Sequence, residues 1–473
     1  MIEHWIDGRP QPSSSRATFD TVDPWTQQPH DEVALAGRDD VDAAVSAARR
    51  AFTRGWATMG FEARGALLHR VADLIVAHAD ELAQADSRDM GKPVAAARTK
   101  DVPRTAQNFR FFADHARLTA AESYPMDSGH HAYSRYEPAG VVAAIAPWNF
   151  PLMLASWKVA PALAWGNTVV LKPAEGSPTS AALLARLATE AGLPDGVLNV
   201  VHGFGPDSAG AFLTEHPDVD RITFTGESNT GRAIAAVAAA NLVPVSLELG
   251  GKGANVVFDD ADLDEAVAWS NKAIFTNSGQ ICLAGSRLLV HRRVFDEFVE
   301  RFVASANALP VGNPADPATE VGPLASKQHF AKVTGFLTDL PDGAAVHGGG
   351  AADDGAWVVR PTVITGVADG ARVCTDEIFG PVVTVSPFDD EDEAVARANA
   401  TRYGLNAMLF TENTRRAHRV AARLNAGTVW VNCFFVRDLR APFGGVGWSG
   451  VGREGGTFSR EFFTEPKAVV MQP

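Results

Sequence analysis

The sequence predicts an α/β protein with a doubly wound parallel sheet, a second α/β domain and a small β extension. The prediction rests on two long runs of alternating strand and helix patterns, which begin near Gly140 and Ala254, and on an isolated strand pattern at the C-terminus. Strand–helix alternation is typical of parallel sheets covered by helices. A chain of 473 residues is also too long for one ordinary core, so two or three units are expected.

The segments before the first alternating run predict short strands and then helices. The first forty residues contain short strand and turn patterns, such as HWIDGRP and TFDTVDPWTQQP. Apolar residues at helical spacing then predict one helix over residues 39–52, a second over 62–87 and a third over about 94–116.

Strands and helices alternate from residue 140 to the C-terminal half of the chain. Strands are predicted at 140–147, 168–173, 197–203, 220–226 and 243–251, with helices between them. A second set begins with ANVVFDDADLDEAVAWSNKAIF and continues to TVWVN near residue 431. The tail, FFTEPKAVVMQP, indicates one strand without a hairpin partner, so we expect it to join another sheet edge, which a second subunit could supply.

Composition and charge exclude several classes of protein. The chain has 46% hydrophobic and 21% charged residues, which is ordinary for a folded globular protein. Its net charge of −14 makes nucleic acid an unfavourable partner. The N-terminus lacks an apolar signal segment, and the apolar run 141–166 contains Pro147, Asn149, Pro151 and Lys158, which are costly in a membrane. A cytoplasmic protein with no membrane partner is expected.

Three scattered cysteines favour a reactive thiol over a disulfide framework or a metal site. Cys282 lies in the loop segment GQICLAGSR, after a helical pattern that ends near Phe275. A thiolate adds readily to a carbonyl carbon, but its usual pKa of about 8.5 must then be lowered by the surroundings. The alternative is that Cys282 is a small buried apolar residue, as free cysteines often are. No metal site is predicted.

Polar residues inside apolar segments are the other catalytic candidates. The amide of Asn149, within PWNFP, is a suitable donor to an oxyanion, although Asn149 could instead be a turn residue. Glu248, in an apolar strand pattern, should have a raised pKa and act as a general base, unless it pairs with Lys252 or the backbone. Lys158 lies in an apolar helical pattern, where its side chain is either buried or extends toward solvent.

Four segments together resemble the aldehyde dehydrogenase superfamily: PWNFP at 147–151, VSLELGGK at 245–252, GQICLAGSR at 279–287 and EIFGPV at 377–382. The resemblance runs from about residue 20 to the C-terminus. It implies that Cys282 is the nucleophile and that Asn149, with the backbone N–H of Cys282, binds the oxyanion. It also implies that Glu248 activates the water that hydrolyses a thioester, and that Lys158 relays protons.

The resemblance implies NAD as the cofactor. The glycine pattern by itself is weak, because Gly203 and Gly205 are followed next by Gly210 and do not give the GxGxxG spacing. The matching family positions place the adenosine ribose at Lys172 and Glu175, and a carboxylate there favours NAD over NADP. The remaining implied cofactor contacts are Trp148, Gly205, Phe224, Thr225, Gly226, Glu377 and Phe379.

Two positions depart from the family pattern. Many relatives have serine after FTG, but this chain has Glu227, and a carboxylate near a pyrophosphate is unfavourable unless it points away, for example to cap its helix. Relatives usually have lysine where this chain has Gly447.

We expect residues 1–118 and 139–249 to form the NAD-binding domain and residues 250–440 to form the catalytic domain. Residues 119–138 and 455–473 are expected to supply oligomerisation strands, so that the chain forms a homo-oligomer, a dimer or a tetramer.

Three segments are similar to the 2-hydroxymuconic and 2-aminomuconic semialdehyde dehydrogenase branch: DVPRTAQNFRFFADHA, FTGES and VNCFFVRDLRAPFGGVGWSGVGREGG. This similarity implies a small aldehyde substrate that ends in a carboxylate, for which arginine offers a two-pronged contact. Arg437, Arg104 and Arg440 are the candidates. Each could instead form a surface ion pair, Arg437 with Asp438 and Arg104 with Asp101.

Other interpretations of the sequence remain open. A CoA-acylating aldehyde dehydrogenase would release its product to a thiol, against which Glu248 argues. A catalytically silent, structural member of the fold is a second alternative, against which Cys282, Glu248 and Asn149 argue together. The substrate could also be a general aliphatic aldehyde, a betaine-type aldehyde or succinic semialdehyde.

Overall fold

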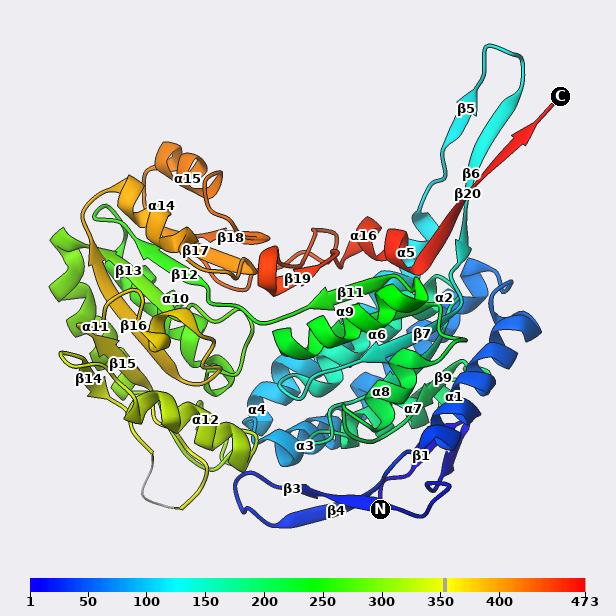
Figure 1. The fold of residues 1–473 in the computed structure, drawn as a ribbon, viewed down its shortest axis with the longest axis horizontal. Coiled ribbons are helices and arrows are strands. Elements are labelled where there is room, and N and C mark those ends of the chain that lie inside the picture. Colours follow the sequence, from blue (N-terminus) through cyan, green and yellow to red (C-terminus); the bar gives the residue numbers. More distant parts are fainter. Residues whose placement is uncertain (352–354, 473) are drawn as a thin grey trace.

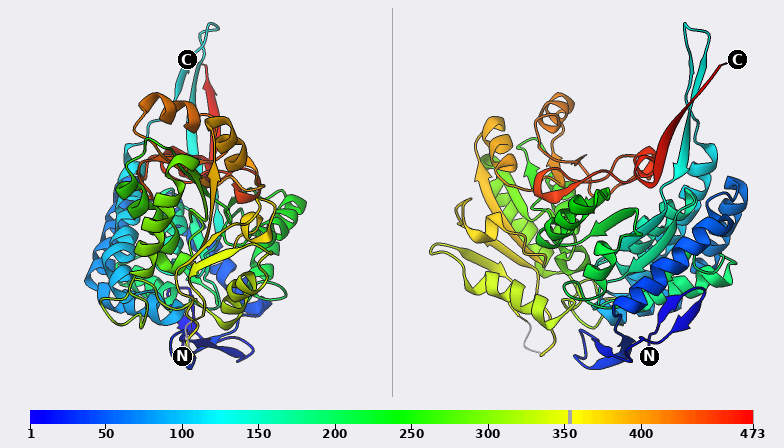
Figure 2. Two further views of the ribbon diagram at one scale, coloured as in Figure 1. Left: turned by 90° about the vertical axis from the view of Figure 1, so that its left-hand side faces the viewer. Right: turned by 45° about the vertical axis from the view of Figure 1, so that its right-hand side comes forward.

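The computed structural model describes residues 1–351 and 355–472. Two lobes, each built on its own sheet with helices on both sides, lie next to each other, and a narrow β arm projects from one of them (Figure 1). The other views show the same arm standing clear of both lobes (Figure 2). The predicted fold class, α/β with a doubly wound parallel sheet and a second α/β unit, is confirmed.

The first sheet has eight strands within the described residues, and its five central strands run parallel. In spatial order the strands are β19 (Gly450–Val451), β11 (Val245–Glu248), β10 (Arg221–Thr225), β7 (Val141–Ile145), β8 (Thr168–Lys172), β9 (Leu198–Val200), β1 (His4–Ile6) and β2 (Arg9–Gln11). The chain winds outward from β7 in both directions, so the sheet is doubly wound. The edge strands β19, β1 and β2 are antiparallel to their neighbours.

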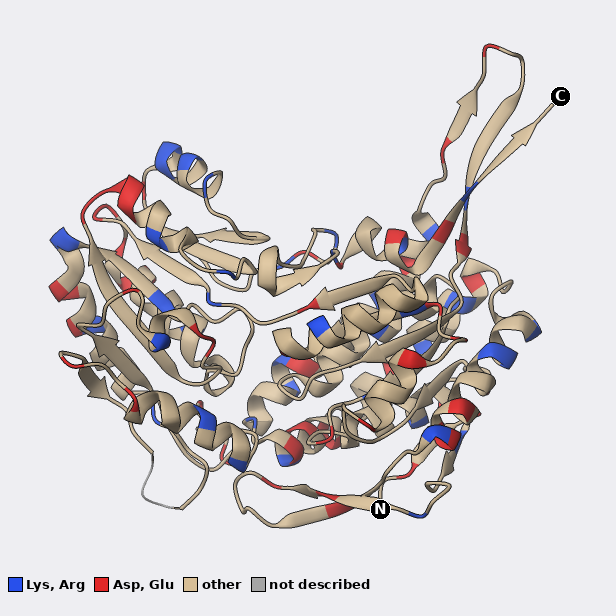
Figure 3. Cartoon of the chain, viewed as in Figure 1, with Lys and Arg blue, Asp and Glu red and all other residues tan. Residues whose placement is uncertain are grey.

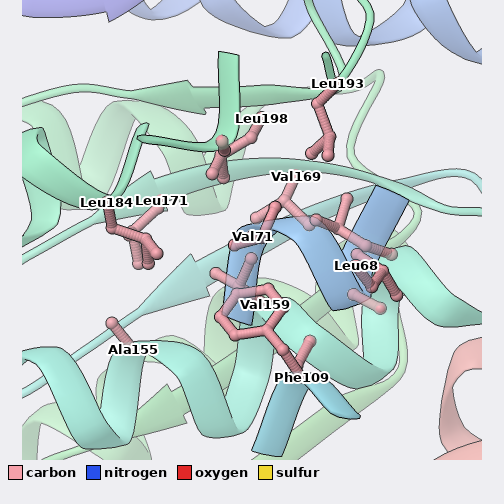
Figure 4. Packing of buried hydrophobic residues seen from close by; sticks show 14 of the residues in the cluster. Leu68, Val71, Phe109, Ala155, Val159, Val169, Leu171, Leu184, Leu193 and Leu198 are labelled. Atoms are coloured by element: carbon pink, nitrogen blue, oxygen red, sulfur yellow. The ribbon is translucent and has the colours of Figure 1, made fainter. Parts of the chain in front are cut away.

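Helices cover both faces of the first sheet, because its buried strands are apolar on both sides. Val169 and Leu171 face the helices α2, α5, α6 and α7, where they pack with Leu68, Phe109 and Val159 (Figure 4). Alternate residues such as Val170 belong to the core under α1, α8 and α9. The helices of this lobe are α1 (Arg38–Ala51), α2 (Phe61–Ala77), α3 (Ala79–Met90), α4 (Val94–Ala96), α5 (Val102–Leu118), α6 (Pro151–Ala164), α7 (Thr179–Glu190), α8 (Ala209–Glu215) and α9 (Ser228–Asn241).

The second sheet is also mostly parallel and winds outward from its own central strand, β12. Its strands, in spatial order, are β14 (Ala345–Gly348), β15 (Thr362–Thr365), β16 (Val382–Phe388), β13 (Arg287–His291), β12 (Ala254–Val257), β17 (Asn406–Phe410) and β18 (Thr428–Val431). The helices that follow in the chain are α10 (Leu263–Phe275), α11 (Phe295–Asn307), α12 (Lys327–Thr338), α13 (Arg372–Thr375), α14 (Glu391–Asn399), α15 (Thr414–Ala421) and α16 (Gly456–Phe463). Helices α10 and α11 cover one face, and α14 and α15 cover the other.

The arm is a three-stranded antiparallel sheet of β5 (Ser123–Pro125), β6 (His131–Pro138) and β20 (Thr464–Met471). As expected, the C-terminal strand joins another sheet edge, but that edge belongs to its own chain and not to a second subunit. All eight residues of β20 pair with β6. The segment 456–463, expected to belong to the strand extension, instead forms helix α16. The remaining two strands, β3 (Thr18–Val22) and β4 (Pro29–Ala34), form a separate hairpin.

Two of the predicted helices are interrupted. The pattern over 62–87 forms α2 and α3, which meet at His78 (φ −104°, ψ 28°), where the ring Nδ1 lies 2.9 Å from the Leu74 carbonyl oxygen. The pattern from residue 94 begins with one α-helical turn, widens into a π-helical turn over Ala97–Asp101 and then continues as α5. Such π turns frequently occur at functional sites.

Acidic and basic side chains are spread over both lobes, while the outer part of the arm carries few of them (Figure 3). Across the described ranges, none of the helices combines the length and apolar character that a membrane crossing requires.

Candidate active site

Several of the candidate residues follow the carboxyl ends of parallel strands in the first sheet, where α/β folds bind ligands. Asn149 follows β7, and Lys172 and Glu248 are the last residues of β8 and β11. Thr225 ends β10, which lies between β7 and β11. The register of the parallel strands therefore brings residues that are far apart in sequence to one edge.

Cys282 lies in a loop after α10 that has an unusual backbone. Three consecutive residues, Asn277, Ser278 and Gly279, have positive φ angles of 55°, 56° and 72°. Such conformations are costly for residues other than glycine and persist only where neighbouring contacts enforce them. Here Ser278 Oγ donates to the Gly322 carbonyl at 2.9 Å, and Gln280 Oε1 accepts from the Ala325 backbone N–H at 2.9 Å.

Cys282 is half-buried, and charged side chains of both signs act on its thiol. Burial raises its pKa to about 12, with a further increase from the carboxylates of Glu377 and Glu248, while Arg437 acts in the opposite direction. The thiol is therefore largely protonated at neutral pH in the absence of further positive charge.

Asn149 is buried next to this loop. Its Nδ2 donates to the Gln280 carbonyl at 3.0 Å, and its backbone oxygen accepts from Asn277 Nδ2 at 2.9 Å. An amide nitrogen has two hydrogens, so one hydrogen remains for a developing oxyanion. Both expectations for Asn149, a structural residue and an oxyanion donor, are compatible with this placement.

Glu248 is 4% exposed, and neither of its carboxylate oxygens has a hydrogen-bond partner among the described residues. Burial and the neighbouring carboxylate of Glu454 raise its pKa well above the usual value, against the opposing effect of Lys158, Arg437 and Arg453. The alternative pairing with Lys252 does not occur, because Lys252 Nζ donates to the Val373 carbonyl at 2.8 Å. An unpaired carboxyl group of this kind is suited to accepting a proton.

Lys158 is fully buried, which excludes the alternative that it extends to solvent. Its Nζ lies 3.1 Å from Glu454 Oε1 and 3.0 Å from Thr223 Oγ1. The sequence analysis did not identify Glu454 as a site residue. It lies in a glycine-rich segment after β19, and only the folded chain brings it to Lys158 and Glu248.

The predicted adenosine contacts lie at the end of β8. Lys172 Nζ donates to the Pro173 carbonyl at 2.9 Å and lies 3.8 Å from Glu175 Oε2. Burial lowers the pKa of Lys172, while Glu175, which is half exposed, raises it. No atom lies within 4 Å of the position that a Cβ on Gly205 would occupy, so the backbone of Gly205 is open to a ligand.

The segment after β10, where a pyrophosphate contact is predicted, is closely packed. The ring of Phe224 lies so close to Gly226 that a Cβ there would come within 2.4 Å of it. Glu227 is the N-cap residue of α9, but its exposed side chain makes no capping hydrogen bond. Its Oε1 accepts from Asn229 Nδ2 at 2.7 Å instead. Capping the helix, one of the ways in which this carboxylate could point away from a pyrophosphate, is therefore not the one that occurs.

Three further predicted cofactor contacts lie close to the loop 276–284 that carries Cys282, here called the nucleophile loop: Glu377, Phe379 and Trp148. Glu377 Oε1 accepts from the Gly251 backbone N–H at 2.9 Å, and a Cβ on Gly251 would lie 2.6 Å from the Cys282 carbonyl oxygen. The Trp148 ring packs edge-on against Phe379, with centroids 5.3 Å apart, and at 5.0 Å from His329. Sequence analysis did not identify His329, whose Nε2 lies 2.7 Å from the Phe379 carbonyl oxygen.

A cavity of about 780 Å³ lies beside Asn149 and the loop that carries Cys282. Its wall includes Phe150 and Asn277, next to Asn149 and within the nucleophile loop, together with Trp157, Arg104 and Arg437. Cys282, Asn149 and Glu248 are not among the described residues that line it. The cavity therefore approaches these groups through Phe150 and Asn277.

Arg437 is held between aromatic rings. Its guanidinium carbon lies 3.7 Å from the Phe443 ring centroid and 4.8 Å from that of Trp157, and its buried Nη2 has no hydrogen-bond partner among the described residues. Burial and the nearby Arg104 lower its pKa to about 10, while Glu454 and Glu248 raise it. The alternative ion pair with Asp438 is not formed, because Asp438 pairs with Arg440.

Arg440 is not brought to the cavity. Its exposed guanidinium forms a surface ion pair with Asp438 at 2.6 Å, and Arg440 does not line the cavity wall. Its expected substrate contact is therefore not supported by its position. Arg104 does line the wall, and its expected alternative partner Asp101 binds Lys92 instead.

The backbone explains why glycine, and not the lysine of many relatives, is found at position 447. Its φ angle is +60°, and a Cβ would lie 2.7 Å from the Arg402 carbonyl oxygen. Lysine at this position would therefore be strained in this backbone. Trp448 follows, with the Arg402 guanidinium 4.1 Å from the centroid of its ring.

Comparison with known proteins decides the family. A family model described as "Aldehyde dehydrogenase family" matches residues 11–469. The chain belongs to the aldehyde dehydrogenase family. The prediction of an NAD-dependent aldehyde oxidoreductase is thereby confirmed.

Individual relatives match this aldehyde dehydrogenase over their whole length. The chain is 52% identical to a 2-hydroxymuconic semialdehyde dehydrogenase from Pseudomonas sp. (strain CF600), covering 100% of this chain and 99% of that protein. It is 42% identical to the 2-aminomuconic semialdehyde dehydrogenase of Homo sapiens, covering 100% and 98%. Its fold matches the NAD⁺ complex of an aldehyde dehydrogenase from Bacillus cereus with a TM-score of 0.97 and 42% identity, covering 99% and 96%.

Proposed function

We propose that this aldehyde dehydrogenase oxidises a semialdehyde that ends in a carboxylate, such as 2-hydroxymuconic or 2-aminomuconic semialdehyde, to the dicarboxylic acid. Arg437 carries the proposal. Arg437 lines the cavity and its buried Nη2 has no hydrogen-bond partner among the described residues, so a carboxylate that reached it would satisfy this donor. Arg104 is the neighbouring positive charge with the largest effect on the pKa of Arg437, and it would bind the same carboxylate.

In the first chemical step Cys282 Sγ, as the thiolate, adds to the aldehyde carbon, and the carbonyl π electrons move to the oxygen. The product is a thiohemiacetal oxyanion bound to the enzyme. The free hydrogen of Asn149 Nδ2 and the backbone N–H of Cys282 stabilise this oxyanion. Arg437 already lowers the pKa of the thiol, which still stands at about 12, so forming the thiolate requires further positive charge near the sulfur.

The residues present fit NAD, because Lys172 and Glu175 provide charged groups after β8 and the backbone of Gly205 after β9 is open. Glu377, from the second lobe, adds a carboxylate that is held by the Gly251 backbone N–H. When bound, NAD supplies a two-electron acceptor for the hydride, which leaves a thioester on Cys282. Glu248 then takes one proton from water, the remaining hydroxide adds to the thioester carbon, and the bond to Cys282 breaks, which releases the acid and leaves Cys282 as the thiolate. The Lys158–Glu454 pair next to Glu248 can pass that proton onward.

The names of the relatives support this choice of substrate. Matching proteins from bacteria and animals are named 2-hydroxymuconic or 2-aminomuconic semialdehyde dehydrogenases. We further propose a cytoplasmic enzyme, consistent with three unpaired thiols, and a homo-oligomer that assembles through the β5–β6–β20 arm. The arm exposes Tyr124, Met126, Val470 and Met471, which favours burial against a second copy.

Steady-state kinetics with two aldehydes of equal length tests the proposed substrate. We expect Arg437→Met to lower kcat/KM about 100-fold for 2-hydroxymuconic semialdehyde, because a charge-assisted contact is lost, and only a few-fold for an uncharged hexadienal. The matched control, Arg440→Met, should leave both values within about twofold. Equal losses on the two aldehydes in the Arg437→Met enzyme would refute the proposal.

A further inference from the structure

Lys92 is a buried cation that the proposed mechanism does not use. It follows Gly91, the residue with φ +76° that ends α3, and its side chain is 2% exposed. A Cβ on Gly91 would lie 2.6 Å from Pro323 Cγ, so the backbone at this turn is fixed by close packing. Lys92 is therefore directed inward with little freedom.

Lys92 has two direct partners. Its Nζ donates to Asp101 Oδ2, and it lies 3.6 Å from the centroid of the Phe150 ring. Asp101 belongs to the π-helical turn before α5, which places its carboxylate in the interior. A desolvated ammonium over an aromatic face makes one of the stronger cation–π contacts.

Phe150 is the next residue after Asn149. On one side the Asn149 side-chain amide donates to the Gln280 carbonyl and the Asn149 backbone carbonyl accepts from Asn277, and both partners belong to the nucleophile loop. On the other side Phe150 is 6% exposed, with its ring against Lys92. The backbone that carries the amide is therefore held between the nucleophile loop and Lys92.

We propose that Lys92 is a positioning residue for the reaction: through the Phe150 ring it holds the Asn149 amide at the place where the oxyanion forms. The inference rests on the proposed oxyanion role of Asn149. Lys92 needs no contact with the substrate for this role, although it lines the cavity wall. Small displacements of an oxyanion donor are costly, because its geometry must match the transition state.

A double-mutant cycle between Lys92 and Asn149 tests this role. Lys92→Met keeps most of the side-chain volume and removes the cation, and we expect kcat to fall about tenfold with little change in the KM for NAD. Asn149→Ala alone should lower kcat about 100- to 1000-fold. Adding Lys92→Met to Asn149→Ala should then cost less than about twofold, because the amide that Lys92 positions is already gone.

Two further variants separate positioning from folding. Lys92→Met leaves Asp101 buried without its cation, so Lys92→Met with Asp101→Asn restores charge balance without restoring the cation–π contact. We expect this pair to regain thermal stability but not kcat. Phe150→Leu should lower kcat to the same extent as Lys92→Met, and Lys92→Arg should recover part of the activity.

The aldehyde series separates positioning from substrate binding. A positioning role predicts equal kcat losses for 2-hydroxymuconic semialdehyde and an uncharged hexadienal in the Lys92→Met enzyme. A loss confined to the charged aldehyde, an unchanged kcat, or a full tenfold loss on top of Asn149→Ala would overturn the inference. A normal kcat in Asn149→Ala alone would instead overturn the proposed oxyanion role itself.

Discussion

The Nζ atom of Lys158 lies 3.1 Å from Oε1 of Glu454, and this buried ion pair is next to the unpartnered carboxyl group of Glu248. The two members of the pair act on Glu248 in opposite directions, because Glu454 raises its pKa and Lys158 lowers it. The pH at which Glu248 becomes an active base therefore depends on how this pair is balanced.

Replacing Glu454 with glutamine should move the activity of this enzyme toward lower pH. The substitution removes the carboxylate that raises the Glu248 pKa and leaves the Lys158 cation that lowers it, so Glu248 ionises earlier as pH rises. The rising limb of the kcat–pH profile should shift to lower pH, measured by NADH formation. The exposed Glu461→Gln in α16 is the control and should not move it. A shift to higher pH would contradict the proposed coupling.

Glu248→Gln should separate thioester formation from hydrolysis. Because the base acts on water only after hydride transfer, the first turnover should proceed and give about one NADH per site. Steady-state turnover should then fall about 100-fold or more. Rapid mixing followed by NADH absorbance measures both phases.

Hydroxylamine, a strong nucleophile that needs less base assistance than water, should partly restore turnover in Glu248→Gln. The control variant Cys282→Ser should show neither the first turnover nor the rescue. If Glu248→Gln lacks the first turnover as well, Glu248 acts before thioester formation.

Glu175→Gln should weaken the preference for NAD over NADP. The neutral amide no longer repels a 2′-phosphate, and the nearby Lys172 then attracts it more effectively. We expect kcat/KM for NADP to rise roughly tenfold while that for NAD falls. Unchanged values for both cofactors would show that the ribose is held elsewhere.

A charge on the arm should weaken self-association. Val470 is 57% exposed on β20, and an aspartate there would be desolvated in an interface between copies. Light scattering should show a smaller assembly for Val470→Asp. Leu242→Asp, at the 89% exposed end of α9, is the matched control and should keep the normal mass. An unchanged mass for Val470→Asp would exclude this part of the arm from the interface.

Much of the fold was predictable because buried parallel strands give continuous apolar runs, such as 141–145 and 168–172, that helical patterns separate. The interruption at His78 was not, because the helical pattern of apolar residues continues through this position. The pairing of β20 with β6 was also not predictable, since about 330 residues separate Glu137 from Lys467.

The candidate site shows the same division. Cys282, Asn149 and Glu248 were candidates because each is a polar or reactive residue in an apolar or loop segment, and their roles were implied by the resemblance of four segments to the aldehyde dehydrogenase superfamily. Glu454 gave no such signal, since its importance comes from contact with Lys158. Arg437 and Arg440 lie three residues apart in one loop, so their sequence positions do not distinguish them. In the folded chain Arg437 lines the cavity, whereas Arg440 pairs with Asp438 at the surface.

The ion pair between Lys158 and Glu454 joins residues that are 296 positions apart in the sequence. Strand β19, formed by residues 450 and 451, pairs with β11, the strand that ends at Glu248. During synthesis on the ribosome, Cys282 therefore emerges well before the carboxylate that neutralises Lys158. A chain truncated before residue 450 would have the sulfur of Cys282 but neither β19 nor Glu454. On the proposed mechanism, such a chain would form the thioester but would not hydrolyse it efficiently.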